Sequence, residues 1–84
     1  MLFEPGRVLI ALQAFKHMHF DFLSESFADH VEGNWGELSE LARENELAVY
    51  NGKPIQSGRR DVAGRACWLL TESDRTETII SIEE

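Results

Sequence analysis

The spacing of apolar residues changes once along this chain of 84 residues, close to Gly52. Before this point apolar side chains recur every three or four residues, which places them on one face of a helix. The clearest series is Phe20, Leu23, Phe27 and Val31. After this point the chain consists of extended runs rich in bulky side chains, which favour strands. Helices that precede most of the strands are typical of an α+β fold.

We predict three short helices packed on one face of a mainly antiparallel sheet of about four strands, in the order β-α-α-α-β-β-β. A chain of this length has room for one thin core, so we expect a single α+β domain over residues 1–84. The expected elements are a strand over residues 7–10, a helix over 11–17, a helix from residue 20 to Gly33, a helix from Ser39 to Asn51, and strands over 55–57, 65–71 and 76–82.

The last two strands are expected to form a hairpin with a turn at residues 72–75. Alternation places every second side chain on the same face, so one row of each strand should face the core. The rows expected in the core are Ala66, Trp68 and Leu70 in one strand and Thr78, Ile80 and Ile82 in the other. Asp21 or Ser24 is the expected N-cap of the helix that ends at Gly33.

The formal net charge is −7, and it is unevenly distributed. Residues 20–51 contain eight acidic residues and one basic residue, whereas residues 52–65 contain four basic residues and one acidic residue. A negative field repels phosphates and attracts basic partners, so we do not expect direct nucleic-acid binding. Cys67 is the single cysteine and is expected to be buried, and no membrane span or export signal is apparent, which indicates a cytoplasmic protein.

No phosphate loop, nucleophile elbow or metal-ligand spacing is present, so we expect neither an enzyme nor a metal or cofactor site. His30 near a helix end suits a modest structural role, where the helix dipole favours a cation. Trp35, between two glycines, is either a core residue or an interface anchor. Asn45 should turn inward and bond the backbone of the loop that contains Trp35. The charged turn at 72–75 is expected to be exposed, with pKa values near normal.

Four features of the sequence carry a resemblance to known proteins. They are His30-Val31-x-Gly33-x-Trp35-Gly36-Glu37-Leu38, Asn45, Gly52-x-x-Ile55-x-Ser57 and Trp68-x-x-Thr71-Glu72-x-Asp74-Arg75-x-x-Thr78. Together they resemble a family of small proteins of bacterial plasmids, phages and related mobile elements. The resemblance covers about the last 55 residues. It departs from the family pattern at Asn34 and at residues 58–61. No activity is established for this family. The resemblance implies that the protein belongs to a mobile element.

In that context we expect an accessory protein that binds a host protein through a basic surface of the host protein. The specific hypothesis is an inhibitor of host defence, anti-CRISPR or anti-restriction in type, with an acidic surface that mimics nucleic acid. The candidate contact residues are Glu25, Asp29, Glu32, Trp35, Glu37, Glu40, Glu44, Glu72, Asp74 and Arg75. One alternative is a structural or regulatory homodimer formed through an edge strand or Trp35. Another is a small enzyme or ligand-binding protein that uses His30, Glu37 or Asp74.

Overall fold

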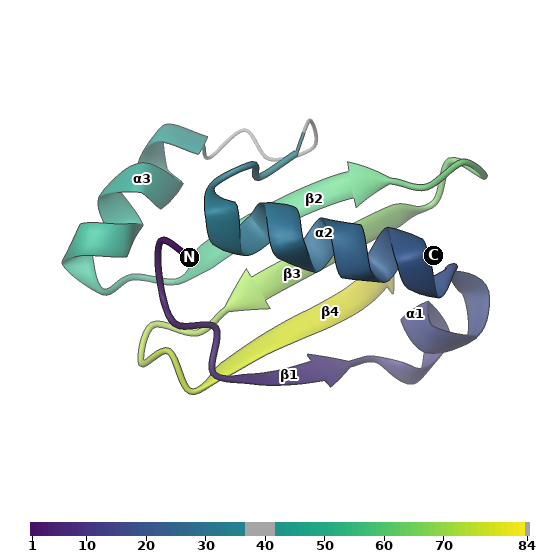
Figure 1. Cartoon of the computed structure of the whole chain (residues 1–84), viewed down its shortest axis with the longest axis horizontal. Helices are drawn as coiled ribbons and strands as arrows, with labels where there is room; N and C mark the ends of the chain where they lie inside the picture. Colours follow the sequence, from purple (N-terminus) through teal and green to yellow (C-terminus); the bar gives the residue numbers. More distant parts are fainter. Residues whose placement is uncertain (37–41, 84) are drawn as a thin grey trace.

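Three helices and four strands follow one another in the predicted order within residues 1–36 and 42–83, the part of the chain that the computed structural model describes (Figure 1). They confirm the α+β class. The elements are β1 (Arg7–Ile10), α1 (Leu12–His17), α2 (Phe20–Glu32), α3 (Ala42–Asn51), β2 (Ile55–Arg60), β3 (Ala66–Thr71) and β4 (Glu77–Glu83). The predicted starting point of the third helix, Ser39, lies outside the described residues.

The strands form one sheet in the order β1-β4-β3-β2. The last three strands are an antiparallel meander, as predicted. The first strand is added in parallel to the outer side of β4, so that β4 becomes an inner strand and β1 and β2 form the two edges. A parallel neighbour requires a long crossover, and here α1, α2 and α3 all lie between β1 and the meander.

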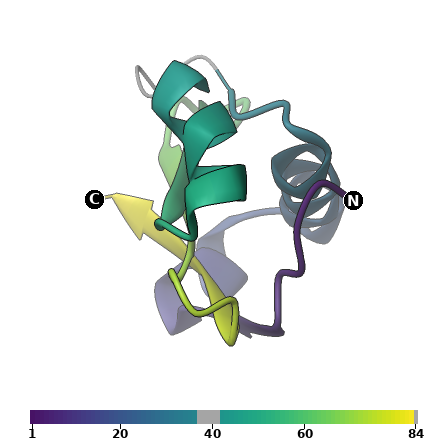
Figure 2. The same cartoon turned by 90° about the vertical axis from the view of Figure 1, so that its left-hand side faces the viewer.

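The helix α2 lies along one side of the sheet, as the end-on view shows (Figure 2). Its N-cap is His19, whose ring Nδ1 accepts a hydrogen bond of 3.2 Å from the backbone N–H of Asp21. The prediction that Asp21 or Ser24 is the N-cap was therefore wrong, because an imidazole nitrogen supplies the acceptor. The helix ends at Gly33 as expected, in the left-handed conformation with φ of 93°.

The row of β3 that faces the helices is the opposite of the predicted one. Cys67, Leu69 and Thr71 are buried on the helix side, whereas Trp68 and Leu70 lie on the other face and are half-buried. In β4 the predicted row is correct, since Leu69 pairs with Ile80. Residues 66–70 are apolar at every position, so alternation alone cannot decide which row is buried.

Trp68 nevertheless has a defined place on the uncovered face of the sheet. Its ring lies over Gly58 of the neighbouring strand, where an added Cβ would clash with the ring. Its indole Nε1–H donates a hydrogen bond of 2.9 Å to Glu83. The absent side chain at Gly58 thus makes room for the tryptophan.

Asn45 of α3 turns inward as predicted, but it bonds a different segment. Its amide donates to the carbonyl of Gln56 (2.6 Å) and accepts from the N–H of the same residue (3.2 Å). The N–H of Gly58, two residues further along β2, donates to the carbonyl of Trp35 (3.1 Å). As a result, α3 and the loop at Trp35 cover two outward-facing positions of the edge strand β2.

Candidate interaction surfaces

His30 lies at the centre of the molecule, with none of its surface exposed. Its Nδ1 is 2.6 Å from the hydroxyl of Ser57 and its Nε2 is 2.8 Å from the hydroxyl of Thr71. The ring of Phe3 packs edge-on against it, with 5.3 Å between ring centroids. Burial lowers the pKa of His30 from 6.5 to about 4. The expectation of a cation at the helix end was therefore wrong, because desolvation outweighs the helix dipole and keeps the ring neutral.

The hydrogen bonds around His30 form a chain whose direction can be deduced. Thr78 donates its hydroxyl proton to the carbonyl of Pro5 (2.7 Å), which can only accept. Thr71 must then donate to Thr78 (2.7 Å), and Nε2–H of His30 must donate to Thr71. The remaining nitrogen, Nδ1, accepts from Ser57. His30 is thus the neutral Nε2–H tautomer, with both nitrogens used to join α2 to the sheet.

Arg75 was predicted to contribute to an exposed contact surface, but it is a structural residue. Its guanidinium donates to the carbonyls of Lys53 (2.7 Å), Glu72 (3.1 Å) and Ala48 (2.8 Å). It also stands 5.7 Å from the ring centroid of Phe3. The backbone of Arg75 is left-handed, with φ of 60°. The side chain joins the β3–β4 turn to the end of α3, and its donors bond carbonyls of the chain itself.

Asp74 stabilises the turn that was predicted at residues 72–75. Its carboxylate accepts from the backbone N–H (3.1 Å) and from the hydroxyl (2.7 Å) of Thr76. These two hydrogen bonds lower the pKa of Asp74, the hydroxyl making the larger contribution, so the expectation of an ordinary pKa was wrong. The neighbouring residue Glu72 is half-buried and contributes its carbonyl to the same turn.

The acidic candidates on α2 are partly neutralised by the basic segment at residues 52–65. Asp29 forms an ion pair of 2.6 Å with Arg59, and Glu32 lies 3.4 Å from the N-terminal ammonium group. Glu25 borders a shallow concavity that Arg59 and Arg60 also line. Glu44 is exposed on α3. Two further candidates, Glu37 and Glu40, lie outside the described residues.

Trp35 lies in the core and not at the surface. It is 6% exposed and belongs to the buried cluster with Phe3, Val31, Ala48 and Ile55. Among the residues that the structure describes, none is a hydrogen-bond partner for its indole N–H. Of the two sequence interpretations, the structure favours packing, and we remove Trp35 from the candidate contact surface.

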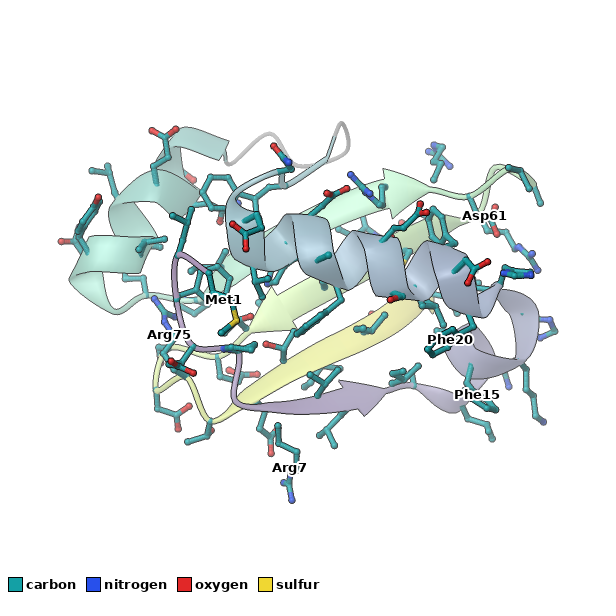
Figure 3. The ribbon with its side chains drawn as sticks, in the orientation of Figure 1. Met1, Arg7, Phe15, Phe20, Asp61 and Arg75 are labelled. Atoms are coloured by element: carbon teal, nitrogen blue, oxygen red, sulfur yellow. The ribbon has the colours of Figure 1, made fainter. Side chains whose placement is uncertain are left out.

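The sequence interpretation missed a surface that we call the apolar edge. It consists of six large side chains from β1, α1 and the start of α2, which are 38% to 70% exposed. Its members are Val8, Leu9, Ile10, Leu12, Phe15 and Phe20. Figure 3 places Phe15 and Phe20 at the end of the molecule where β1 ends. A signal was present in the sequence: residues 7–20 contain no acidic residue in a chain that contains 15.

The backbone of β1 is open on the side away from β4. The N–H groups of Arg7 and Ala11 donate to β4, at the carbonyls of Thr76 and Ile80 (2.8 Å each). Backbone groups of a strand alternate in direction, so those of Val8 and Ile10 point outward. The two edges of the sheet therefore differ, because the outward groups of Gln56 and the outward N–H of Gly58 in β2 are bonded within the chain.

Neither a metal centre nor a membrane span is indicated in the part of the chain that the structure describes. Within residues 1–36 and 42–83 no three potential metal-ligating side chains lie together, and no helix is long and apolar enough to cross a membrane. No known family model, curated protein or solved structure matches the chain. The resemblance to a family of mobile-element proteins therefore stays a prediction.

Proposed function

We propose that this chain is a non-catalytic binding protein that contacts another protein through the apolar edge. The observation that carries the proposal is the exposure of six large apolar side chains around an open strand edge. Contiguous exposed apolar surface is characteristic of protein contact sites, and an open edge can accept a further strand. Both features occur at the same place in this molecule.

The geometry around the titratable candidates supports a role without catalysis. His30 is enclosed and has both ring nitrogens engaged. Asp74 is exposed and its carboxylate holds Thr76. A general acid or base must reach a substrate proton, and neither side chain combines such reach with a shared pocket.

The proposal is tested by removing the apolar edge without touching the core. Phe15→Ser combined with Phe20→Ser deletes its two most exposed side chains. A matched control is Leu47→Ser combined with Tyr50→Ser, which deletes two exposed side chains of α3 at 56% and 88% exposure. Each protein is immobilised and used to capture partners from a bacterial host lysate, and any captured protein is purified and titrated against all three forms.

The edge variant is expected to lose at least tenfold in affinity, since each exposed phenylalanine buries enough surface to contribute more than about 1 kcal/mol. The α3 control should bind like the natural chain. Equal binding by all three forms would contradict the proposal.

A second proposal keeps the expected role in host defence. The exposed carboxylates of Glu44 and Glu46 lie on α3, beside the strand edge opposite to β1. We propose that these carboxylates, with Glu25, bind a basic surface of a cytoplasmic host protein that otherwise holds nucleic acid. Opposite charges and the predicted mobile-element context favour an anti-CRISPR or anti-restriction target.

Purified defence complexes provide the test of this second proposal. Glu44→Gln with Glu46→Gln should weaken binding, whereas Glu4→Gln with Glu77→Gln removes equal charge on the β1 side and should not. Binding of the natural chain should also fall as the salt concentration rises, because salt screens exposed charges. Binding that is indifferent to salt and to both variants would refute the electrostatic version.

A further inference from the structure

We propose that the partner of the apolar edge is a second copy of this chain, and that the two β1 strands pair antiparallel around a twofold axis at Leu9. The inference rests on the proposed use of the apolar edge and names its occupant. It follows from five observations on the described residues: the direction of the backbone groups, the rows of side chains across the sheet, the distribution of charge, the exposed apolar area and the hydrogen bonds that cover the opposite edge.

The backbone of β1 determines the register. The outward positions are Val8 and Ile10, two residues apart, with Leu9 between them. When two such strands run antiparallel, Val8 of one copy and Ile10 of the other exchange both N–H···O bonds. The symmetry-related pair does the same, giving four new hydrogen bonds. Leu9 then lies on the axis, opposite the same residue of the second copy.

The uncovered face of the sheet fits this register. Leu70, Ile79 and Leu9 are partners across β3, β4 and β1, and they form one apolar row that ends at the open edge. All three are partly exposed. Directly opposed residues in adjacent strands are in contact, so pairing at Leu9 joins this row to the same row of the second copy. A single apolar stripe would then cross six strands, three from each copy.

The charge distribution favours a second copy over a basic partner at this edge. Residues 7–20 contain Arg7 and Lys16 and no acidic residue, although the whole chain carries a net charge of −7. A basic partner would be drawn to the acidic helices and not to this segment. Two copies that meet at residues 7–20 keep their two α3 helices apart, because α3 lies beside β2 at the opposite edge.

The exposed area is sufficient for a stable pair. A buried aromatic side chain contributes about 150–250 Å². The exposed 64% of Phe15 and 70% of Phe20 therefore supply roughly 400–670 Å² over two copies. Stable interfaces bury about 1,200–2,000 Å² in total, so these two residues provide about a third or more of the lower limit. The other members of the apolar edge and the paired backbones supply the remainder.

The opposite edge explains why association would stop at two copies. Asn45 and the carbonyl of Trp35 occupy outward positions of β2 at Gln56 and Gly58. A further sheet therefore cannot add there without displacing these bonds. With one open edge per chain, edge-to-edge pairing closes as a twofold dimer and does not continue as a fibre.

Sedimentation velocity over a range of concentrations tests the pairing. The natural chain should sediment as a dimer at high concentration. Val8→Pro removes an outward N–H that β1 does not use within the chain, so the variant should sediment as a folded monomer. Leu9→Lys places two ammonium groups on the axis and should also be monomeric. Leu47→Lys, which adds the same charge on α3, should remain dimeric.

Cysteine cross-linking tests the register. Leu9→Cys should form an intermolecular disulfide on mild oxidation, because it faces its own copy in the pair without hydrogen bonds, where Cβ atoms are closest. Leu47→Cys should not. Cys67 is buried and does not compete, since burial raises its thiol pKa to about 11.

Failure of the dimer and failure of the proposed function give different results. A natural chain that sediments as a monomer at every concentration would overturn self-pairing. If the Phe15 and Phe20 variant then still loses a captured host protein, the proposed use of the apolar edge stands with another occupant. If the natural chain is a dimer that Val8→Pro and Leu9→Lys leave intact, the proposed interface is wrong.

Discussion

At the scale of single residues, the polar side chains of the core carry more of the architecture than their pattern in the sequence indicates. Ser57, His30, Thr71 and Thr78 belong to four different elements, and their hydrogen bonds form one directed chain that ends at the carbonyl of Pro5. A buried polar group without a partner is costly, so each member depends on its neighbours. These hydrogen bonds form only when the four elements are correctly placed. They occupy both ring nitrogens of His30, so neither nitrogen is available for chemistry.

Stability should fall as the solution becomes mildly acidic. Burial lowers the pKa of His30 to about 4, so between this value and 6.5 the unfolded chain binds a proton more readily than the folded chain. The contribution of His30 is complete above pH 6.5 and is lost as the pH falls toward 4. The free energy of unfolding should decrease by about 2 kcal/mol between pH 7 and pH 5.

Urea unfolding at several pH values measures this loss. In a folded His30→Leu variant, the free energy of unfolding should depend less on pH. Nuclear magnetic resonance of the natural chain gives an independent readout. The His30 ring signals should not titrate above pH 5, and their nitrogen shifts should report the Nε2–H tautomer. A titration midpoint near 6.5 would contradict the enclosed, neutral ring.

Thr71→Val should destabilise the protein by about 1–3 kcal/mol, because the Nε2–H of His30 loses its acceptor inside the core. Thr71→Ser is the matched control, since it keeps the hydroxyl and removes one methyl group, at a cost of about 1 kcal/mol. Urea unfolding at neutral pH measures both. A valine variant as stable as the serine variant would show that the hydroxyl is not required.

At the scale of elements, the predictable parts are those in which local signals agree. The spacing of Leu23, Phe27 and Val31 and the glycine at position 33 predict α2 almost to the residue. The turn residues 72–75 and the strands on either side predict the last hairpin. The other features depend on contacts between distant parts of the chain. The apolar run of β3 fits the core in either orientation, and Asn45 has two possible backbone partners, the loop before α3 and the strand after it.

The apolar edge could not be predicted from periodicity for a related reason. Residues 8–10 are all apolar, which is the pattern of a buried strand. Only the sheet order shows that β1 is an edge strand with a single neighbour. Arg75 is similar, because a charged residue in a turn is usually solvated, and here the chain folds back to bring three carbonyls to it.

Two variants, Arg75→Ala and Arg75→Gly, separate the contribution of the side-chain hydrogen bonds of Arg75 from that of its left-handed backbone. Both variants lose the hydrogen bonds to the carbonyls of Lys53, Glu72 and Ala48, and both should be less stable than the natural chain by about 1.5–3 kcal/mol. Glycine tolerates the φ of 60° and alanine does not, so the alanine variant should be the less stable by about 1 kcal/mol. Thermal unfolding gives both values. If neither variant is destabilised, Arg75 does not hold α3 in place.

At the scale of the whole molecule, the two sheet edges have opposite properties. The β2 edge is covered by α3 and the loop at Trp35, and exposed acidic residues of α3 lie near it. The β1 edge is open and apolar, and residues 7–20 contain no acidic residue. This asymmetry underlies both proposals: self-association at one edge, and attraction of a basic host protein at the other. In a dimer paired at β1, the α3 helices of the two copies would lie at the two distant ends.

Amide hydrogen exchange, resolved by residue and measured over a range of protein concentrations, tests the role of the β1 edge most directly. The N–H groups of Gln56 and Gly58 serve as internal controls, because their hydrogen bonds within the chain should protect them at every concentration. The N–H groups of Val8 and Ile10 should exchange fast in dilute solution and become protected as the concentration rises. Exchange at Val8 and Ile10 that is the same at all concentrations would contradict the pairing of β1 with a second copy.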